Sequence, residues 1–188
     1  EVYNYPELRD ELRSFGCVFS TTGDTEVVMQ ALLTWGTAAF SRFNGMWAIA
    51  LYDSVERRLM LSRDRFGVKP LFYLRVDGGL AFGSTCRAVA LLTGQSLKPS
   101  LIATTDFLLT SSCSWPDRTW FEGMHEVQAG HFLIWENGRA QANPYYELNG
   151  AEGPEPNDLA ALFMDAVKIR LRSDVTIGVC LSGGVDSS

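Results

Sequence analysis

The middle of the chain alternates apolar and polar residues with the two-residue period of a β-strand. This alternation predicts four strands, at residues 46–52, 58–63, 71–76 and 80–84. Short runs of Asp, Ser and Gly separate them, and these residue types favour turns. We therefore predict a β-meander, followed further along by a hairpin with an Asn137-Gly138 turn. A brief additional strand is predicted at residues 18–20.

On either side of this region, apolar residues recur every three or four positions, which is the period of an amphipathic helix. Helices are predicted at residues 6–15, 24–35, 85–92 and 98–109 and from residue 158 onwards. Asp24 and Asp158 are expected to cap the helices that follow them. Pro99 is expected in the first turn of its helix, where a missing N–H costs nothing.

An apolar run at residues 175–180 predicts a buried strand, and a Ser- and Gly-rich segment, residues 181–188, follows it. Glycines let backbone N–H groups turn toward a phosphate, and the start of a following helix adds partial positive charge. The segment has neither the lysine of a Walker A loop nor a G-x-G-x-x-G spacing. It therefore predicts a loop that holds pyrophosphate as a unit, with Asp186 bringing in Mg²⁺.

Composition suggests where one domain ends and another begins. Residues 147–157 are rich in glycine, proline and acidic residues, which is typical of a linker. We place one domain at residues 1–146 and the start of a second at residues 158–188. A chain of 188 residues suffices for one domain and part of another. Because the sequence begins at Glu1 and stops inside the Ser- and Gly-rich segment, we expect an internal piece of a longer protein.

The chain carries 16 basic and 22 acidic residues, a net charge of −6, so no nucleic-acid partner is expected. Its one basic cluster, Lys168, Arg170 and Arg172, is interpreted as a solvated helix end. No apolar run approaches the length of a membrane helix, so no membrane association is expected. The four cysteines lack Cys-x-x-Cys spacing, which favours a cytoplasmic location. His125 and His131 lack a metal-site pattern and are interpreted as structural.

Four ordered segments resemble one family. They are residues 1–5 (EVYNY), 22–26 (TGDTE), 43–73 (with FNGMWA and RDRFGVKPLFY) and 182–188 (SGGVDSS). Together they resemble glutamine-hydrolysing asparagine synthetase, and the resemblance extends over nearly the whole chain.

The resemblance implies an α+β fold. It consists of a partial Ntn-type αββα sandwich of a class II glutamine amidotransferase, followed by the first helix, strand and loop of an α/β PP-loop ATP pyrophosphatase domain. The implied enzyme is a ligase that hydrolyses glutamine and passes ammonia to aspartate, which ATP and Mg²⁺ activate as an adenylate. Glutamine, aspartate and ATP are thus the expected small-molecule partners, and a homodimer is left open.

The same resemblance assigns site residues. Glu1 and Asp24 are expected to contact glutamine, with Asp24 opposite its α-ammonium group. The implied ATP-binding residues are Leu181, Ser182, Gly183, Gly184, Asp186, Ser187 and Ser188, with Asp186 also the metal ligand.

A second motif, around Arg63 and Asp64, is expected to be architectural. Gly67 is expected to need a positive φ and Pro70 to fix the chain before a strand. An ion pair between Arg63 and Asp64 is expected to lock the turn.

The glutaminase nucleophile of the family is an N-terminal cysteine that its own α-amino group activates. None of the cysteines here, at positions 17, 86, 113 and 180, stands in that position, so no catalytic residue is assigned and the chain as printed is expected to be inactive. Two other functions stay open. One is a related enzyme of the β-lactam-synthetase type that adenylates another carboxylate, and the other is a non-catalytic partner module.

Overall fold

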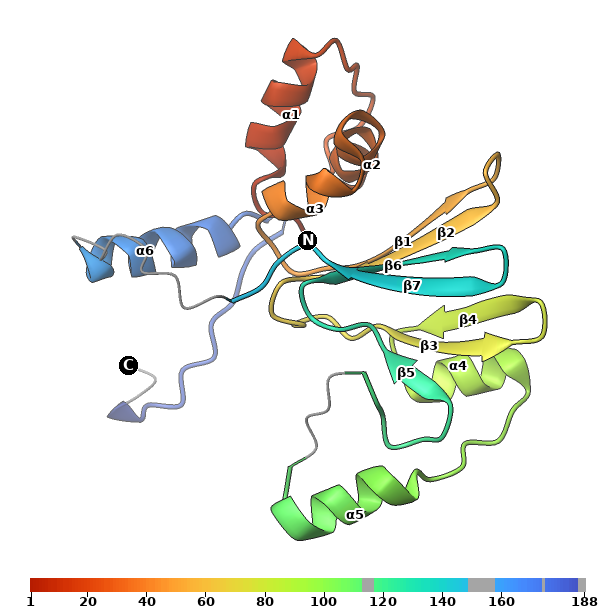
Figure 1. Cartoon of the computed structure of the whole chain (residues 1–188). Coiled ribbons are helices and arrows are strands. Elements are labelled where there is room, and N and C mark those ends of the chain that lie inside the picture. Colours follow the sequence, from red (N-terminus) through yellow and green to blue (C-terminus); the bar gives the residue numbers. More distant parts are fainter. Residues whose placement is uncertain (113–116, 149–157, 174, 186–188) are drawn as a thin grey trace.

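The computed structural model describes residues 1–112, 117–148, 158–173 and 175–185. Two antiparallel sheets face each other, and helices lie on the outer side of each sheet (Figure 1). The resulting order of layers is helix, sheet, sheet, helix. The expected α+β fold, with its αββα sandwich, is therefore confirmed.

The first helical layer lies at the N-terminal end of the chain. It consists of α1 (Tyr5–Ser14), α2 (Asp24–Trp35), the 3-10 turn η1 (Gly36–Ala38) and α3 (Ala39–Arg42). Leu8 and Leu12 on α1 are buried against α2. Residues 18–20 do not form the predicted strand, because the Ser20 N–H is bonded to the Glu26 carboxylate and is not free for a ladder.

The first sheet contains four antiparallel strands in the order β1-β2-β6-β7. They are β1 (Ala48–Asp53), β2 (Arg58–Arg63), β6 (His131–Glu136) and β7 (Arg139–Pro144). Strand β2 is internal and its side chains alternate between two cores: Met60 packs toward the helices, whereas Leu59 and Leu61 pack toward the second sheet. The predicted hairpin is confirmed, with Asn137 at φ 49° and Gly138 at φ 75°, as a type I′ turn requires.

The second sheet contains three antiparallel strands in the order β4-β3-β5. They are β3 (Phe72–Val76), β4 (Gly79–Gly83) and β5 (Met124–Glu126). The predicted meander is wrong, because β2 pairs with β6 and β3 pairs with β5, so the four strands are divided between two sheets. Residues 64–71 carry the chain from one sheet to the other.

Two helices follow the second sheet. They are α4 (Cys86–Thr93), which Thr85 caps through its hydroxyl, and α5 (Leu101–Thr110), which Ser100 caps in the same way. Helix α4 packs on the outer face of the sheet through Val89. Pro99 precedes α5 instead of lying in its first turn, because Ser100 caps the helix and its first residue is Leu101.

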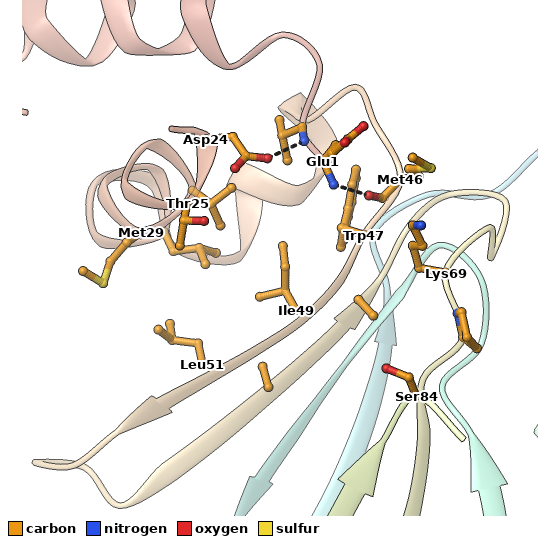
Figure 2. Close-up of a pocket in the computed structure, with 16 residues that line it drawn as sticks. Glu1, Asp24, Thr25, Met29, Met46, Trp47, Ile49, Leu51, Lys69 and Ser84 are labelled. Carbon is orange, nitrogen blue, oxygen red and sulfur yellow. Dashed lines mark hydrogen bonds between the residues drawn. The ribbon is translucent and has the colours of Figure 1, made fainter. Parts of the chain in front are cut away.

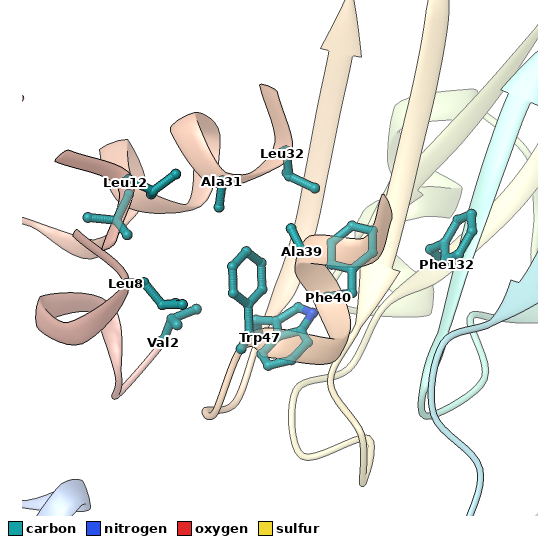
Figure 3. Close-up of a cluster of buried hydrophobic side chains, with 11 residues drawn as sticks. Val2, Leu8, Leu12, Ala31, Leu32, Ala39, Phe40, Trp47 and Phe132 are labelled. Carbon is teal, nitrogen blue, oxygen red and sulfur yellow. The ribbon is translucent and has the colours of Figure 1, made fainter. Parts of the chain in front are cut away.

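The largest core lies between the first helical layer and the first sheet and is rich in aromatic rings (Figure 3). Phe40 is fully buried and packs edge-on against Phe43 at 6.0 Å and stacked on Phe132 at 5.7 Å between ring centroids. Trp47 stacks on Tyr145 at 6.0 Å. Such pairs combine a large apolar area with a preferred geometry, so the stacking of Phe40 on Phe132 holds α3 against β6.

The C-terminal part contains α6 (Leu159–Arg170), which Asp158 caps as predicted by accepting from the Ala161 N–H. Residues 175–180 do not form the predicted buried strand, and Val175 and Val179 are 77% and 76% exposed. A strand needs a neighbour for its backbone N–H and C=O groups, and the described residues offer none at this place. Among those residues, no helix combines the length and apolar character that crossing a membrane requires.

Candidate functional site

A groove of about 680 Å³ lies between α2, strand β1 and the connection that leads into β3 (Figure 2). Its walls are mostly apolar and come from the exposed sides of α2 and β1. Lys69 and Ser84 lie on the side opposite α2 (Figure 2), and Pro70 also lines the groove. Two acidic residues, Glu1 and Asp24, lie at one end, so we call it the Glu1–Asp24 groove.

The backbone brings Glu1 and Asp24, which the resemblance assigns to glutamine, to the same groove. The Val2 N–H donates to Asp24 Oδ2 at 2.9 Å, which ties the first residues of the chain to the start of α2. On its other side this segment bonds to residue 46, with the Met46 N–H donating to the Glu1 carbonyl oxygen at 2.9 Å. Two carboxylates on one apolar groove form a site that suits a cationic group.

Asp24 does not cap α2. It is the first residue of the helix, Gly23 holds the cap position, and no side chain caps the N-terminus. The capping interpretation is therefore wrong, since the Asp24 carboxylate accepts from Val2 instead. Its place in the first turn still suits a negative charge, because the helix dipole is positive there.

Gly45 allows the first residues to approach β1. A Cβ atom at this position would lie 2.1 Å from the Glu1 carbonyl oxygen and 2.8 Å from Val2 Cα, both far inside contact distance. Only glycine fits, so this residue determines where Glu1 can lie.

The loop before Asp24 is held from both sides by charged residues. Arg9 donates to the carbonyl oxygens of Thr22 at 2.7 Å and Gly23 at 2.8 Å. The Glu26 carboxylate accepts from the N–H and hydroxyl groups of Ser20 and Thr21. These bonds, led by that from the Thr21 hydroxyl, lower the pKa of Glu26 from an ordinary 4.5 to about 2.

The Asp64 carboxylate organises the connection that supplies Lys69. It is 1% exposed and accepts from the backbone N–H groups of Trp47, Phe66, Val68 and Lys69. Gly67 has φ +64°, as predicted. The bonds to Asp64 fix the backbone of this segment, whose residues Lys69 and Pro70 line the groove.

The predicted Arg63–Asp64 ion pair is wrong. Arg63 pairs with Glu126 at 2.8 Å and donates to the carbonyl oxygens of Gly67, Lys69 and Val127. The two side chains diverge because adjacent strand residues point to opposite faces of a sheet.

The predicted phosphate loop is described only in part. Residues 181–185 follow an extended segment, and Gly183 has φ +75°, which suits a tight turn. Asp186, Ser187 and Ser188 lie outside the described residues. Hydroxyls, glycine backbone amides and a carboxylate are donors and ligands that fit a polyphosphate with Mg²⁺.

The cysteines and histidines of the described chain lie away from the groove. Cys17, Cys86 and Cys180 are free thiols, and none of them lines it. His125 stacks on Tyr73, and His131 Nδ1 lies 2.8 Å from the Ala129 carbonyl oxygen. Within the described ranges, no three His, Cys, Asp or Glu side chains gather as metal ligands would.

Sequence reasoning missed Arg9, Glu26 and Arg172. Arg172 was interpreted as part of a solvated helix end, but it pairs with Glu7 and donates to the Tyr3 carbonyl oxygen. No spacing in the sequence pairs residues so far apart, so the only signal was the presence of charge next to recognised segments.

Comparison with known proteins places these features in a family. The family model described as a glutamine amidotransferase domain matches residues 1–146, and that described as asparagine synthase matches residues 158–188. A Mycobacterium tuberculosis protein, named provisionally as a glutamine-hydrolysing asparagine synthetase, is 35% identical over the whole chain. Asparagine synthetase 3 of Bacillus subtilis, also named as glutamine-hydrolysing, is 31% identical, and the amidase chyE of Penicillium rubens is 33% identical, each again over the whole chain.

The chain spans about a third of these relatives: 31%, 31% and 29% of their lengths, respectively. The solved structure of glutamine phosphoribosylpyrophosphate amidotransferase from B. subtilis covers 79% of this chain with a TM-score of 0.55. This chain covers 28% of that protein, and at 17% identity the likeness concerns the fold alone. The chain belongs to the glutamine amidotransferase domain family, and it continues into the start of an asparagine synthase domain.

Proposed function

We propose that this chain is part of a glutamine-dependent asparagine synthetase. In the proposed reaction, glutamine supplies ammonia, ATP activates the side-chain carboxylate of aspartate as an adenylate, and ammonia displaces AMP. The observation that carries the amidotransferase half is the placement of Glu1 and Asp24 on one groove. The family matches and the relatives support the second half.

The Glu1–Asp24 groove has the chemistry that glutamine needs. The Asp24 carboxylate keeps Oδ1 available beside the bond from Val2, so it can accept from the α-ammonium group of the substrate. The apolar wall of α2, with Val28 and Leu32, suits the methylene groups of the side chain. In this proposal Glu1 supplies a second negative charge to the same ammonium group.

The synthetase half rests on the loop at residues 181–188. Ser182, Gly183, Gly184, Ser187 and Ser188 would hold the phosphates, the Leu181 backbone would lie near the nucleotide, and Asp186 would hold Mg²⁺. The metal, when bound, neutralises charge on the phosphates as pyrophosphate leaves. A carboxylate oxygen of aspartate attacks the α-phosphorus, pyrophosphate departs, and the resulting mixed anhydride reacts with ammonia to give asparagine and AMP.

Two substitutions in the full-length protein separate the two halves. Asp24→Asn keeps an oxygen for the Val2 N–H but loses the charge, so the KM for glutamine should rise about 10–100-fold. Synthesis with free ammonium as the nitrogen source should stay near wild type. Asp186→Asn should abolish AMP release and leave glutamine hydrolysis largely intact.

The matched control is Asp77→Asn, which removes a carboxylate from the exposed turn between β3 and β4. It should change neither activity. Equal loss of both activities in Asp24→Asn and in Asp186→Asn would contradict a protein with two separate sites.

A second candidate is an enzyme of the same plan that adenylates another carboxylate. One relative that matches the whole chain is named amidase chyE and not asparagine synthetase, so the family includes proteins with other names. AMP formation that does not depend on aspartate would select this candidate.

A further inference from the structure

A second, smaller cavity of about 300 Å³ lies where the C-terminal segment meets the N-terminal residues. Arg172 and Val175 line it from one side, and Glu1 and Asp24 line it from the other. Glu1 and Asp24 therefore border both this cavity and the groove. The segment that leads into the predicted phosphate loop thus lies directly against the glutamine site.

Arg172 makes the contacts that join the two parts. Its guanidinium forms a two-bonded pair with the Glu7 carboxylate, with Nη1 at 2.7 Å from Oε2 and Nη2 bonded to Oε1. The same Nη1 donates to the Tyr3 carbonyl oxygen at 2.6 Å. Arg170, two residues earlier, lies over the Tyr3 ring at 5.5 Å from its centroid. We call Arg172, Glu7 and Tyr3 the latch.

The ion pair alone would not explain these contacts. The Arg172 and Glu7 side chains are 36% and 57% exposed, and an exposed pair contributes little to stability. The bond to Tyr3 differs from this exposed ion pair, because Tyr3 is 7% exposed and its carbonyl belongs to the backbone segment from Glu1 to Tyr3. A planar guanidinium with a carboxylate on one edge has a fixed direction for its remaining donors. Glu7 therefore aims Arg172 at the Tyr3 carbonyl.

The backbone from Glu1 to Tyr3 is held on several sides. Met46 bonds Glu1, Asp24 accepts from the Val2 N–H, and Asn44 accepts from the Tyr3 N–H at 2.7 Å. These contacts come from the amidotransferase domain. The bond to the Tyr3 carbonyl oxygen comes instead from Arg172, nine residues before Leu181. We propose that Arg172 is a positioning residue for the glutamine site, supplied by the segment that leads into the phosphate loop. This inference rests on the proposed function of the Glu1–Asp24 groove.

The inference predicts a particular pattern among variants of the full-length protein. Arg172→Met removes both the ion pair and the bond to Tyr3, so the KM for glutamine should rise roughly 5–10-fold while the kcat of glutamine hydrolysis changes less than about twofold. Arg172→Lys keeps the charge and an N–H donor but loses the planar two-bonded pair with Glu7 that aims the donor, so its KM should lie between those of wild type and Arg172→Met. AMP formation with free ammonium should be unaffected in both, because the latch does not touch the nucleotide.

The charge-swapped double variant Glu7→Arg/Arg172→Glu separates positioning from simple ion pairing. It restores a pair of opposite charges, but a carboxylate at position 172 cannot donate to a carbonyl oxygen. Its KM for glutamine should therefore stay as high as that of Arg172→Met. The matched control is Arg13→Met, which removes an exposed pair with Asp10 on the same helix as Glu7 and should leave the KM unchanged.

Two results would overturn the inference: a wild-type KM in Arg172→Met, or a KM that the charge swap restores. A parallel fall in ammonium-dependent AMP formation in Arg172→Met would also overturn it, since this would indicate general destabilisation. The proposed function fails separately, if Asp24→Asn leaves the glutamine KM unchanged while Arg172→Met raises it.

Discussion

The buried Asp64 carboxylate is predicted to contribute more to the stability of the fold than any surface charge around it. Its two oxygens accept from four backbone N–H groups in the connection between the sheets and at the start of β1. Asp64→Asn keeps the size of the side chain but turns one oxygen into an NH₂ group, which faces N–H donors. The substitution therefore tests the charge and the acceptor role of the carboxylate without a change in side-chain size.

The magnitude follows from the bonds that are lost. Whichever way the amide lies, one pair of N–H groups loses its acceptor: Phe66 with Val68, or Trp47 with Lys69. A hydrogen bond to a charged group contributes about 1.5–3 kcal/mol, and the Trp47 bond is long at 3.3 Å, so the total loss is about 3–5 kcal/mol. For a domain of this size this lowers Tm by roughly 6–20 °C.

Thermal unfolding followed by near-ultraviolet circular dichroism measures this change. The matched control is Asp53→Asn, because Asp53 Oδ1 also accepts from two backbone N–H groups, those of Val55 and Glu56, but in a turn between β1 and β2 where the side chain is open to water. The asparagine oxygen can keep both bonds there, so Tm should fall by no more than about 3 °C. Equal Tm values for the two variants would refute the reasoning.

Two further predictions concern the residues around the groove. In Gly45→Ala, the added methyl group must displace the backbone of Glu1, so we expect the free energy of unfolding to fall by about 1–3 kcal/mol and the KM for glutamine to rise. Thermal unfolding measures the first effect and glutaminase kinetics the second. The control is Gly79→Ala, whose Cβ would meet only Val76 at an ordinary 3.6 Å. If the two variants behaved alike, close approach at Gly45 would not be the cause. The lowered pKa of Glu26 means that its bonds to residues 20 and 21 stabilise the fold fully above pH 4.5, and that this stabilisation is lost as the pH falls toward 2. The difference in Tm between wild type and Glu26→Gln should accordingly shrink between pH 5 and pH 2, and a difference independent of pH would contradict this.

Much of the local structure was predictable from the sequence, because it depends on neighbours along the chain. Strand β2 begins and ends at the predicted residues, and the Asn137-Gly138 turn has the predicted positive φ values. Asp158 caps α6 as expected. Glu1 and Asp24 line one groove, but only the resemblance, and no property of the two residues themselves, assigned both to one site, and their contact with glutamine stays a prediction.

What could not be predicted depends on contacts between distant segments. Alternation identified β2 and β3 as strands, but it carries no information on which strand pairs with which, so the meander was wrong. Strand β5 has only three residues, too few for a period to show. The role of Arg172 depends on a partner 165 residues away, and its position near a helix end favoured solvent. The apolar run at residues 175–180 lacks a neighbouring strand among the described residues, so the hydrophobic pattern predicted a strand that does not form there.

The most direct test of the proposed synthetase follows oxygen atoms from aspartate. If the side-chain carboxylate attacks the α-phosphorus of ATP, aspartate labelled there with ¹⁸O must transfer one labelled oxygen to AMP when ammonia displaces it. We predict that the full-length protein, given glutamine, Mg²⁺ and ATP, forms AMP that carries one ¹⁸O atom per asparagine formed, as mass spectrometry of the nucleotide would show. Unlabelled AMP, or the release of ADP with labelled inorganic phosphate, would contradict the proposed adenylate.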